Sequence, residues 1–157
     1  MSTWESLKVV AILNYTYGID AAGLWQLDSL TYEVTRGGRI RRIRRGDLLY
    51  ATVRSDGSLA LTLEGIKPLT TDNGFMDRYG VFVDEASEDE VKRGNSAFAG
   101  HIVRAGADIR PRMDVPVMNK RGSLIAVGMA VISGQSMMAF KKGVAVKVRD
   151  HMLPKNS

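Results

Sequence analysis

The chain has 157 residues, enough for one domain or two small ones, and its 45% hydrophobic and 25% charged content is typical of a folded globular protein. It has no cysteine, which excludes disulfides, thiol catalysis and thiolate metal sites, and its two histidines are too few to predict a zinc site. The net charge is +5, no apolar run reaches the roughly 18 residues that span a bilayer, and the start shows no signal-peptide pattern. We therefore expect a soluble cytoplasmic protein without membrane contact, metal or cofactor.

The first half of the chain predicts a helix-poor lead-in followed by a β-meander. Residues 9–17 are apolar with aromatic side chains, and residues 20–27 predict one or two helical turns. From Leu30 onward, dipeptides that favour tight turns recur at Gly37-Gly38, Gly46-Asp47 and Asp56-Gly57. Residues 48–53 and 59–63 between them have strand composition, and alternation predicts a shared buried face for Leu59, Leu61 and Leu63.

The second half predicts a mixed succession of strands and short helices. Residues 70–77 are rich in Thr, Asp, Asn and Gly, which is typical of a linker, and a short strand over residues 79–83 follows. Ser87 and Glu90 have the spacing of a capping box, and Gly94 ends the helix that they begin. Further strands are predicted over residues 97–104, 114–118, 124–132 and 144–149. A short helix capped by Ser133 runs to Phe140, and Gly143 closes it.

Charge is segregated along the chain, which creates a field able to attract phosphate backbones. Six arginines fall within ten positions, at Arg36, Arg39, Arg41, Arg42, Arg44 and Arg45. A second basic group lies late in the chain, at Lys141, Lys142, Lys147 and Arg149. Alternation in the last strand places Lys147 and Arg149 on one face and Val146 and Val148 on the other, so a basic face lies over an apolar one.

The order of motifs from residue 79 onward resembles a PUA domain, a small RNA-binding barrel. The motifs are Phe98-Ala99-Gly100-His101-Ile102-Val103, Ala107-Asp108-Ile109-Arg110-Pro111, Asp114-Val115-Pro116-Val117, Ile125-Ala126-Val127-Gly128 and the last strand. Among PUA domains, it is most similar to the one that ends the archaeosine-type tRNA-guanine transglycosylase of archaea. The segments Tyr15-Thr16-Tyr17-Gly18, Gly38-Arg39-Ile40-Arg41 and Leu49-Tyr50-Ala51-Thr52-Val53-Arg54 resemble the small domain that precedes it there.

This resemblance implies an α+β fold in two domains. A small α+β meander domain would occupy residues 1–76, and a PUA-type, mostly antiparallel β-barrel would occupy residues 77–157. One turn departs from the family: Pro111-Arg112-Met113-Asp114 stands where Pro-Gly-Asp-Glu is usual, so Arg112 occupies a glycine position and adds a charge near the RNA groove.

The resemblance also implies what the chain does not do alone. The full enzyme carries a catalytic barrel with an aspartate nucleophile and base and a Cys-rich zinc site, and 157 residues without cysteine hold neither. We therefore expect no catalytic residue and a subunit that binds the acceptor stem and 3′ end of tRNA, so that a catalytic transglycosylase subunit modifies a guanine of the D arm. A stand-alone PUA protein remains open, acting in ribosome assembly or another RNA modification, including relatives of archaeosine synthase.

The candidate RNA-binding residues follow from the basic strand and from the turn that the family places near the groove. They are Arg104, Arg110, Arg112, Lys141, Lys142, Lys147, Arg149 and His151. The six clustered arginines are a possible second surface for RNA or an acidic partner. Ile40 and Ile43 break the period of two there, which predicts a bulge or an irregular hairpin.

Other notable side chains have simpler explanations. His101 is expected to be a structural histidine of a strand, and the carboxylates of residues 84–90 complement the dipole of a helix start. The methionines of the second half are expected to fill the core. Trp4 and Trp25 either belong to the core or dock a catalytic partner.

Overall fold

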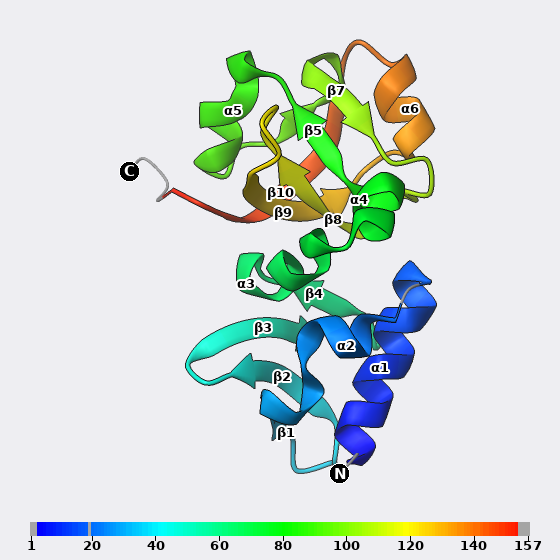
Figure 1. The fold of residues 1–157 in the computed structure, drawn as a ribbon, viewed down its shortest axis with the longest axis vertical. Helices are drawn as coiled ribbons and strands as arrows, with labels where there is room; N and C mark the ends of the chain where they lie inside the picture. Colours follow the sequence, from blue (N-terminus) through cyan, green and yellow to red (C-terminus); the bar gives the residue numbers. More distant parts are fainter. Residues whose placement is uncertain (1–2, 19, 154–157) are drawn as a thin grey trace. The chain divides into compact units, whose positions relative to one another are not determined.

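The computed structural model describes residues 3–18 and 20–153, which form two compact units, Met1–Leu69 and Thr70–Ser157 (Figure 1). Each unit combines helices with its own β-sheet, which confirms the predicted α+β class. The predicted domain boundary after residue 76 stays a prediction. Over the described ranges, no helix is long and apolar enough to cross a membrane.

Unit 1 begins with a regular helix, so the prediction of a helix-poor lead-in is wrong. Helix α1 (Trp4–Tyr17) starts at Thr3, whose side chain accepts a hydrogen bond from the Ser6 N–H while the Ser6 hydroxyl accepts one from the Thr3 N–H. Gly18 ends the helix at a φ of 64°. The buried face is formed by Ser6, Val9, Leu13 and Tyr17. Apolar residues on the exposed face as well obscure the helical period in the sequence.

The predicted meander is confirmed, because four consecutive strands pair antiparallel in chain order. They are β1 (Leu30–Val34), β2 (Ile40–Arg45), β3 (Leu48–Val53) and β4 (Leu59–Leu61), with α2 (Ala21–Trp25) preceding them. Each predicted glycine turn is present, with φ of 83° at Gly38, 58° at Gly46 and 88° at Gly57. These left-handed conformations strain other residues, which is why glycine stands at all three.

The predicted bulge is also present, in the arginine-rich strand. Glu33 pairs with Arg42 and Val34 pairs with Ile40, so Arg41 is an extra residue in β2. The extra residue shifts the phase of alternation and lets Ile40 and Ile43 both point into the core, where they are 5% and 0% exposed.

Strand β4 ends earlier than predicted, at Leu61. The Thr62 hydroxyl accepts a hydrogen bond from the Gly65 N–H at 3.1 Å and starts helix α3 (Leu63–Ile66). Leu59 and Leu61 are buried, but Leu63 belongs to the helix and is half-buried, so the three do not share one strand face. Trp25 is core: its indole Nε1–H donates to the Gly65 carbonyl at 2.8 Å.

Two local predictions at the start of unit 2 are wrong. Most of the predicted linker is helical, since Asp72 caps α4 (Asn73–Tyr79), whose Phe75 and Tyr79 are buried with ring centroids 5.4 Å apart. Helix α5 (Glu85–Lys92) is capped by Asp84 and not by Ser87. The Asp84 carboxylate accepts the Ser87 N–H at 3.0 Å, which puts Ser87 inside the first turn.

The sheet of unit 2 is six-stranded and curls into a nearly closed barrel. Its order is β6 (Ala97–Phe98), β10 (Val144–His151), β9 (Leu124–Ala130), β8 (Asp114–Met118), β5 (Val81–Val83) and β7 (Ile102–Ala105). Only β5 and β8 pair in parallel; the other pairs are antiparallel. The two edge strands β6 and β7 are separated in the chain only by a 3-10 turn, Ala99–His101, so the sheet has to bend until its edges approach each other.

That 3-10 turn interrupts the strand predicted over residues 97–104. Helix α6 (Gly134–Ala139) is capped by Ser133, as predicted, through a 3.1 Å hydrogen bond from the Ser136 N–H to the Ser133 hydroxyl. Met113, Met118 and Met137 fill the core as expected, whereas Met138 is half exposed.

Candidate nucleic-acid interface

The last strand carries a basic face only in part. Lys147 is exposed, Val146 is buried and Val148 is half-buried, as the alternation predicted. A bulge follows, because Val148 pairs with Gly128 and Asp150 with Val127, which makes Arg149 the extra residue. The simple alternation therefore stops at Val148.

Arg149 takes part in an ion pair inside the sheet. Its Nη2 lies 2.5 Å from the Asp114 Oδ2 on β8, two strands away in the sheet order. The Asp114 side chain is 2% exposed and that of Arg149 is 31% exposed. A carboxylate removed from water needs a compensating cation, so this arginine has a structural role whatever else it binds.

The bulge that carries Arg149 depends on a glycine in the neighbouring strand. A Cβ atom on Gly128 would lie 2.4 Å from the Lys147 carbonyl oxygen and 2.8 Å from the Val148 Cα. No side chain fits between β9 and β10 at this point. Gly128 thus permits the close approach of the two strands next to the ion pair.

Arg112 has a backbone conformation that glycine adopts more readily than other residues. Its φ is 76°, in the left-handed region, and its N–H donates to the Ala130 carbonyl at 2.7 Å. The Ala130 N–H donates in turn to the Met113 carbonyl at 2.8 Å. The turn is therefore held by the end of β9, and the strained residue presents an exposed guanidinium.

Strand pairing brings three predicted residues together. Ala130 binds the Arg112 N–H and pairs with Val146, while Asp114 pairs with Met129, which pairs with Lys147. Arg112, in the turn before β8, and Lys147 and Arg149, on β10, therefore lie on either side of the end of β9. Within the described residues, ion pairs are absent for Arg110, Arg112, Lys141, Lys142 and Lys147, all of which are exposed.

The other predicted residues lie apart from this group. Arg104 is on the edge strand β7, with its Cζ 4.7 Å from the centroid of the Phe82 ring and its Nη2 3.3 Å from Asp77 Oδ1. The His151 Nδ1 lies 3.2 Å from the Lys92 carbonyl oxygen and also contacts the Leu153 carbonyl, so His151 is part of the ordered strand end.

His101 lies in the 3-10 turn Ala99–His101 and not in a strand as expected, but it does have a structural partner. Its Nδ1 lies 3.0 Å from Asp84 Oδ2 at the start of α5. Burial by itself raises the pKa of Asp84, but hydrogen bonds from His101 and the Ser87 N–H, with the attraction of His101, lower it below its ordinary value. Acids in the first turn of α5, Glu85 and Glu88, complement the helix dipole. Residues 3–18 and 20–153 contain no group of three metal-ligating side chains.

The arginine hairpin, formed by β1, β2 and their turn, holds the six clustered arginines. Arg42 and Arg44 both pair with Glu33, at 3.8 Å and 3.2 Å. The Arg45 Nη2 donates to Gln26 Oε1 at 2.7 Å and the Arg39 Nη2 donates to the Ser55 carbonyl at 3.3 Å, without neutralising charge. Arg36 and Arg41 are exposed and form no ion pair with the described residues. Among the described residues, one carboxylate thus pairs with two of the six arginines, and the other four form no ion pair.

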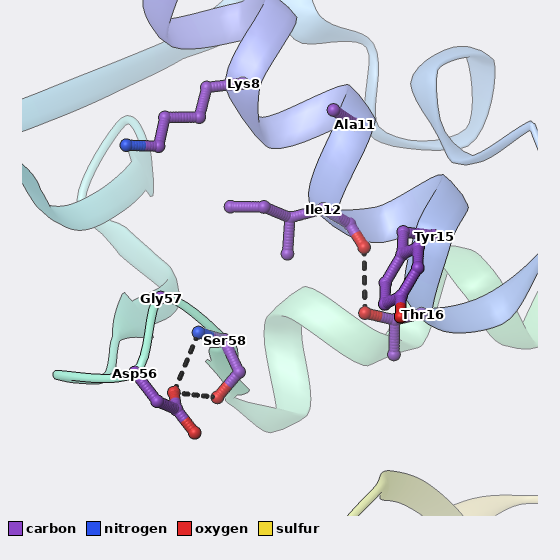
Figure 2. Close-up of a pocket in the computed structure, with 8 residues that line it drawn as sticks. All are labelled: Lys8, Ala11, Ile12, Tyr15, Thr16, Asp56, Gly57 and Ser58. Atoms are coloured by element: carbon purple, nitrogen blue, oxygen red, sulfur yellow. Dashed lines mark hydrogen bonds between the residues drawn. The ribbon is translucent and has the colours of Figure 1, made fainter.

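Unit 1 also has an apolar surface on helix α1. Trp4, Leu7 and Tyr15 are 50%, 60% and 90% exposed, and with Ala11 they form a stripe opposite the buried face. A groove of about 400 Å³ adjoins this stripe, between α1 and the turn after β3 (Figure 2). It is lined by Lys8, Ala11, Ile12, Tyr15, Thr16, Asp56, Gly57 and Ser58.

The turn on the far side of the groove is well organised. The Ser58 hydroxyl donates to Asp56 Oδ1 at 2.6 Å and the Ser58 N–H donates to the same atom at 2.9 Å (Figure 2). These hydrogen bonds lower the pKa of the Asp56 carboxyl.

The sequence predictions missed the acids that decide which arginines are available. Asp114 and Glu33 each reach an arginine across a sheet, which local patterns do not show. For Asp114 the sequence held one signal, since this acid falls at the start of an otherwise apolar strand.

Comparison with known proteins identifies both units. Residues 79–152 match the PUA domain, and residues 8–71 match the patch-forming domain C2 of tRNA-guanine transglycosylase. The chain therefore carries these two domains in the order that the resemblance predicted.

The similar curated proteins are archaeal tRNA-guanine(15) transglycosylases. The chain is 36% identical over 142 residues to that of Pyrococcus abyssi and 35% identical over 144 residues to that of Methanothermobacter thermautotrophicus. Each match covers 90% of this chain but only 24% and 22% of the respective relative. The chain thus spans about a quarter of the length of these relatives.

Two solved structures share the fold. A hypothetical protein from Pyrococcus horikoshii aligns with a TM-score of 0.74 at 24% identity, over 96% of this chain and 92% of the other. A conserved PUA domain protein from Thermoplasma acidophilum aligns with a TM-score of 0.61 at 24% identity, over 96% and 91%. The predicted PUA-type barrel is confirmed by this likeness.

Proposed function

We propose that this chain is a tRNA-binding, non-catalytic component of archaeosine biosynthesis that works with a separate tRNA-guanine transglycosylase chain. The observation that carries the proposal is the extent of the match. Nine-tenths of the chain aligns with the transglycosylases, yet it spans only about a quarter of their length, over the C2 and PUA domains. These two domains support a role in binding tRNA, and in this proposal the catalytic barrel belongs to another chain.

The exposed cations of unit 2 suit a clamp on the acceptor stem. Duplex RNA is recognised mainly through its phosphates, 2′-hydroxyls and shape, so basic side chains on a rigid sheet are an appropriate surface. Arg112 lies in the turn before β8 and Lys147 lies on β10, and both lie beside the end of β9, while Arg110 belongs to the same turn as Arg112. Arg149 contributes its partly exposed guanidinium while it neutralises Asp114.

The arginine hairpin is proposed as a second phosphate-binding surface. Guanidinium groups that lack acids nearby repel one another, and phosphate oxygens relieve that repulsion with directed hydrogen bonds. Arg36 and Arg41 offer the most available charge, since both are exposed and neither pairs with Glu33.

The apolar stripe of α1 is proposed as the docking surface for the catalytic chain. A phosphate backbone gains nothing from Leu7 and Ala11, whereas exposed aromatic and aliphatic side chains beside a groove are typical of a protein contact. Trp4 would then serve as a partner-binding tryptophan, the alternative that the sequence left open.

The first experiment measures tRNA binding and exchange activity together. The chain should bind tRNA with an affinity that falls with salt, at a log–log slope of roughly −0.7 to −0.9 per phosphate contacted. Guanine exchange into tRNA should require both this chain and the catalytic transglycosylase of the same organism. A nearly flat salt dependence, or binding to ribosomal particles without a transglycosylase partner, would contradict the proposal.

A second experiment tests the α1 surface. Leu7→Asp places a charge in the apolar stripe and should weaken association with the catalytic chain at least about tenfold, as expected for an interface anchor. Val103→Asp, a matched change at a 47% exposed residue of unit 2, should leave association unchanged. Equal effects of the two changes would exclude α1 as the docking surface.

A further inference from the structure

The groove of unit 1 has walls from two segments that are distant in the sequence. One wall is helix α1, where Lys8, Ile12 and Thr16 follow one another every four residues and therefore form a row along the helix. The other wall is the turn of residues 56–58 after β3 (Figure 2). Eight residues of helix rise about 12 Å, so the groove is long enough for a linear segment of roughly three or four extended residues.

Most polar groups of the lining already have partners within the groove walls. The Thr16 hydroxyl donates to the Ile12 carbonyl at 2.8 Å (Figure 2). The Ser58 hydroxyl and the Ser58 N–H both donate to Asp56 Oδ1, which holds the carboxylate in one orientation. The lining therefore offers a ligand mainly the apolar side chain of Ile12 and the ring of Tyr15, which is 90% exposed.

Two opposite charges remain available on the groove walls. Within the described residues, neither Lys8 nor Asp56 forms an ion pair, and both are exposed. The two hydrogen bonds from Ser58 end on Asp56 Oδ1 and leave Oδ2 outside them. A carboxylate repels a phosphate backbone, and an apolar lining gives phosphates no hydrogen bonds, so the groove favours a protein segment over RNA.

We propose that this groove binds a short segment of the catalytic chain that carries an apolar side chain between an acidic and a basic residue. The apolar side chain covers Ile12 and the ring of Tyr15. The acidic residue pairs with the Lys8 ammonium, and the basic residue pairs with Asp56 Oδ2. Because the two walls carry opposite charges, they determine the direction in which the segment runs. The inference rests on the proposed function in taking the catalytic chain as the partner, and it adds the chemistry and direction of the docking segment.

The test measures association with the catalytic transglycosylase chain of the same organism by isothermal titration calorimetry. Asp56→Asn removes the charge but keeps an oxygen that accepts the Ser58 hydrogen bonds, and Lys8→Gln removes the charge of the opposite wall. Each change should weaken association by about 3- to 10-fold and make it less sensitive to salt, because it removes one ion pair from a partly enclosed groove. Asp47→Asn is the matched control, since Asp47 is an exposed acid of another turn of unit 1 outside the groove, and it should leave association unchanged.

A double charge reversal separates two origins of this effect. Lys8→Glu with Asp56→Lys exchanges the charges of the two walls, whereas the charges of the partner segment stay as they are. Association should therefore remain at least about tenfold weaker than that of the wild-type chain. Recovery of wild-type association in the double variant would mean that Lys8 and Asp56 act only on each other, and would overturn the inference.

Other occupants of the groove are distinguished by two further measurements. A lower salt slope of tRNA binding in Lys8→Gln would assign the groove to RNA, and a dimer of this chain that Asp56→Asn dissociates would assign it to a second copy; either result overturns the inference. Unchanged association of Asp56→Asn and Lys8→Gln with the catalytic chain would also overturn it and leave the proposed function intact. Absence of association between the wild-type chain and the catalytic chain would overturn both.

Discussion

The two units use their arginines in opposite ways. In the arginine hairpin of unit 1, only two of the six arginines form an ion pair with a described carboxylate, Glu33. In unit 2, three arginines each pair with a separate acid: Arg149 with Asp114, Arg104 with Asp77 and Arg78 with Asp108. The cations of unit 2 that are available for a ligand are therefore those that form no ion pair.

This difference shows why counting basic residues does not locate a binding surface. A cation that neutralises a buried acid contributes to folding first, whereas an unpaired surface cation costs little to redirect toward a phosphate. The arginine hairpin keeps most of its charge available, and unit 2 keeps Arg110, Arg112, Lys141, Lys142 and Lys147. The comparison predicts that substituting a paired cation mainly lowers stability, whereas substituting an unpaired cation mainly weakens RNA binding.

The largest expected effect comes from a substitution in α3, which packs against β3, the strand next to the arginine hairpin. A Cβ atom on Gly65 would lie 2.0 Å from the Tyr50 carbonyl oxygen of β3, so Gly65→Ala has to displace backbone. We expect the unfolding free energy of unit 1 to fall by about 3 kcal/mol or more. Tryptophan fluorescence reports on this unit, since Trp4 and Trp25 both belong to it.

Gly23→Ala is the matched control, because it also lies in a short helix but a Cβ atom there meets nothing within 4 Å. It should stabilise unit 1 slightly, by roughly 0.5–1 kcal/mol. Similar destabilisation by both changes would mean that helix propensity, and not the close approach to Tyr50, explains the result.

The next effect tests whether Arg149 belongs to folding. Arg149→Ala leaves the Asp114 carboxylate buried without this cation and should lower the unfolding free energy by about 2–4 kcal/mol. Asp114→Ala should cost less, since the 31% exposed arginine can turn toward water. Chemical denaturation of both variants gives the comparison. If Arg149→Ala keeps the wild-type stability but loses much of its RNA affinity, the main role of Arg149 is to bind RNA and not to support folding.

A smaller effect concerns the pair at the start of α5. Asp84→Ala removes the helix cap and should cost about 1 kcal/mol at pH 7. Because the folded protein lowers the pKa of Asp84, its stabilising contribution is present above the unfolded value near about 3.9 and is lost as pH falls through the folded value. Denaturation curves of wild type and variant should therefore converge below about pH 4.

Glu85→Ala removes an exposed acid from the same first turn without removing the cap. It should cost at most roughly 0.5 kcal/mol, the value of a surface charge near a helix dipole. A constant difference between wild type and Asp84→Ala from pH 7 to pH 2 would show that ionisation of Asp84 does not contribute.

The sequence predicted those parts of the fold that depend on single residues. Gly38, Gly46 and Gly57 form the expected turns, since a left-handed φ leaves few alternatives to glycine. Ser133 caps its helix, and strand β8 has the predicted bounds. Local chemistry alone is sufficient for such features.

The remaining parts depend on contacts between distant residues. Helix α1 has apolar residues on two faces, so the sequence shows no clear helical period. Only the folded structure shows which of the two faces is buried. Arg149 was assigned to a basic face because alternation was assumed to continue, but the register of β8, β9 and β10 introduces a bulge and places Asp114 within reach.

The smallest expected effect separates strain from charge at one residue of unit 2. Arg112 has a φ of 76°, a conformation that costs a residue with a side chain about 1–3 kcal/mol. Glycine relieves this strain, but its larger conformational entropy in the unfolded state offsets part of the stabilisation. Arg112→Gly should therefore raise the unfolding free energy by roughly 0.5–1 kcal/mol, as measured by chemical denaturation. Arg112→Gln keeps the strain but removes the charge, so it should leave stability unchanged and reduce the salt slope of tRNA binding by about one phosphate. If both variants bind tRNA with the wild-type salt slope, Arg112 lies outside the interface. Fewer of the unpaired cations of unit 2 then contact RNA than the comparison of the two units implies.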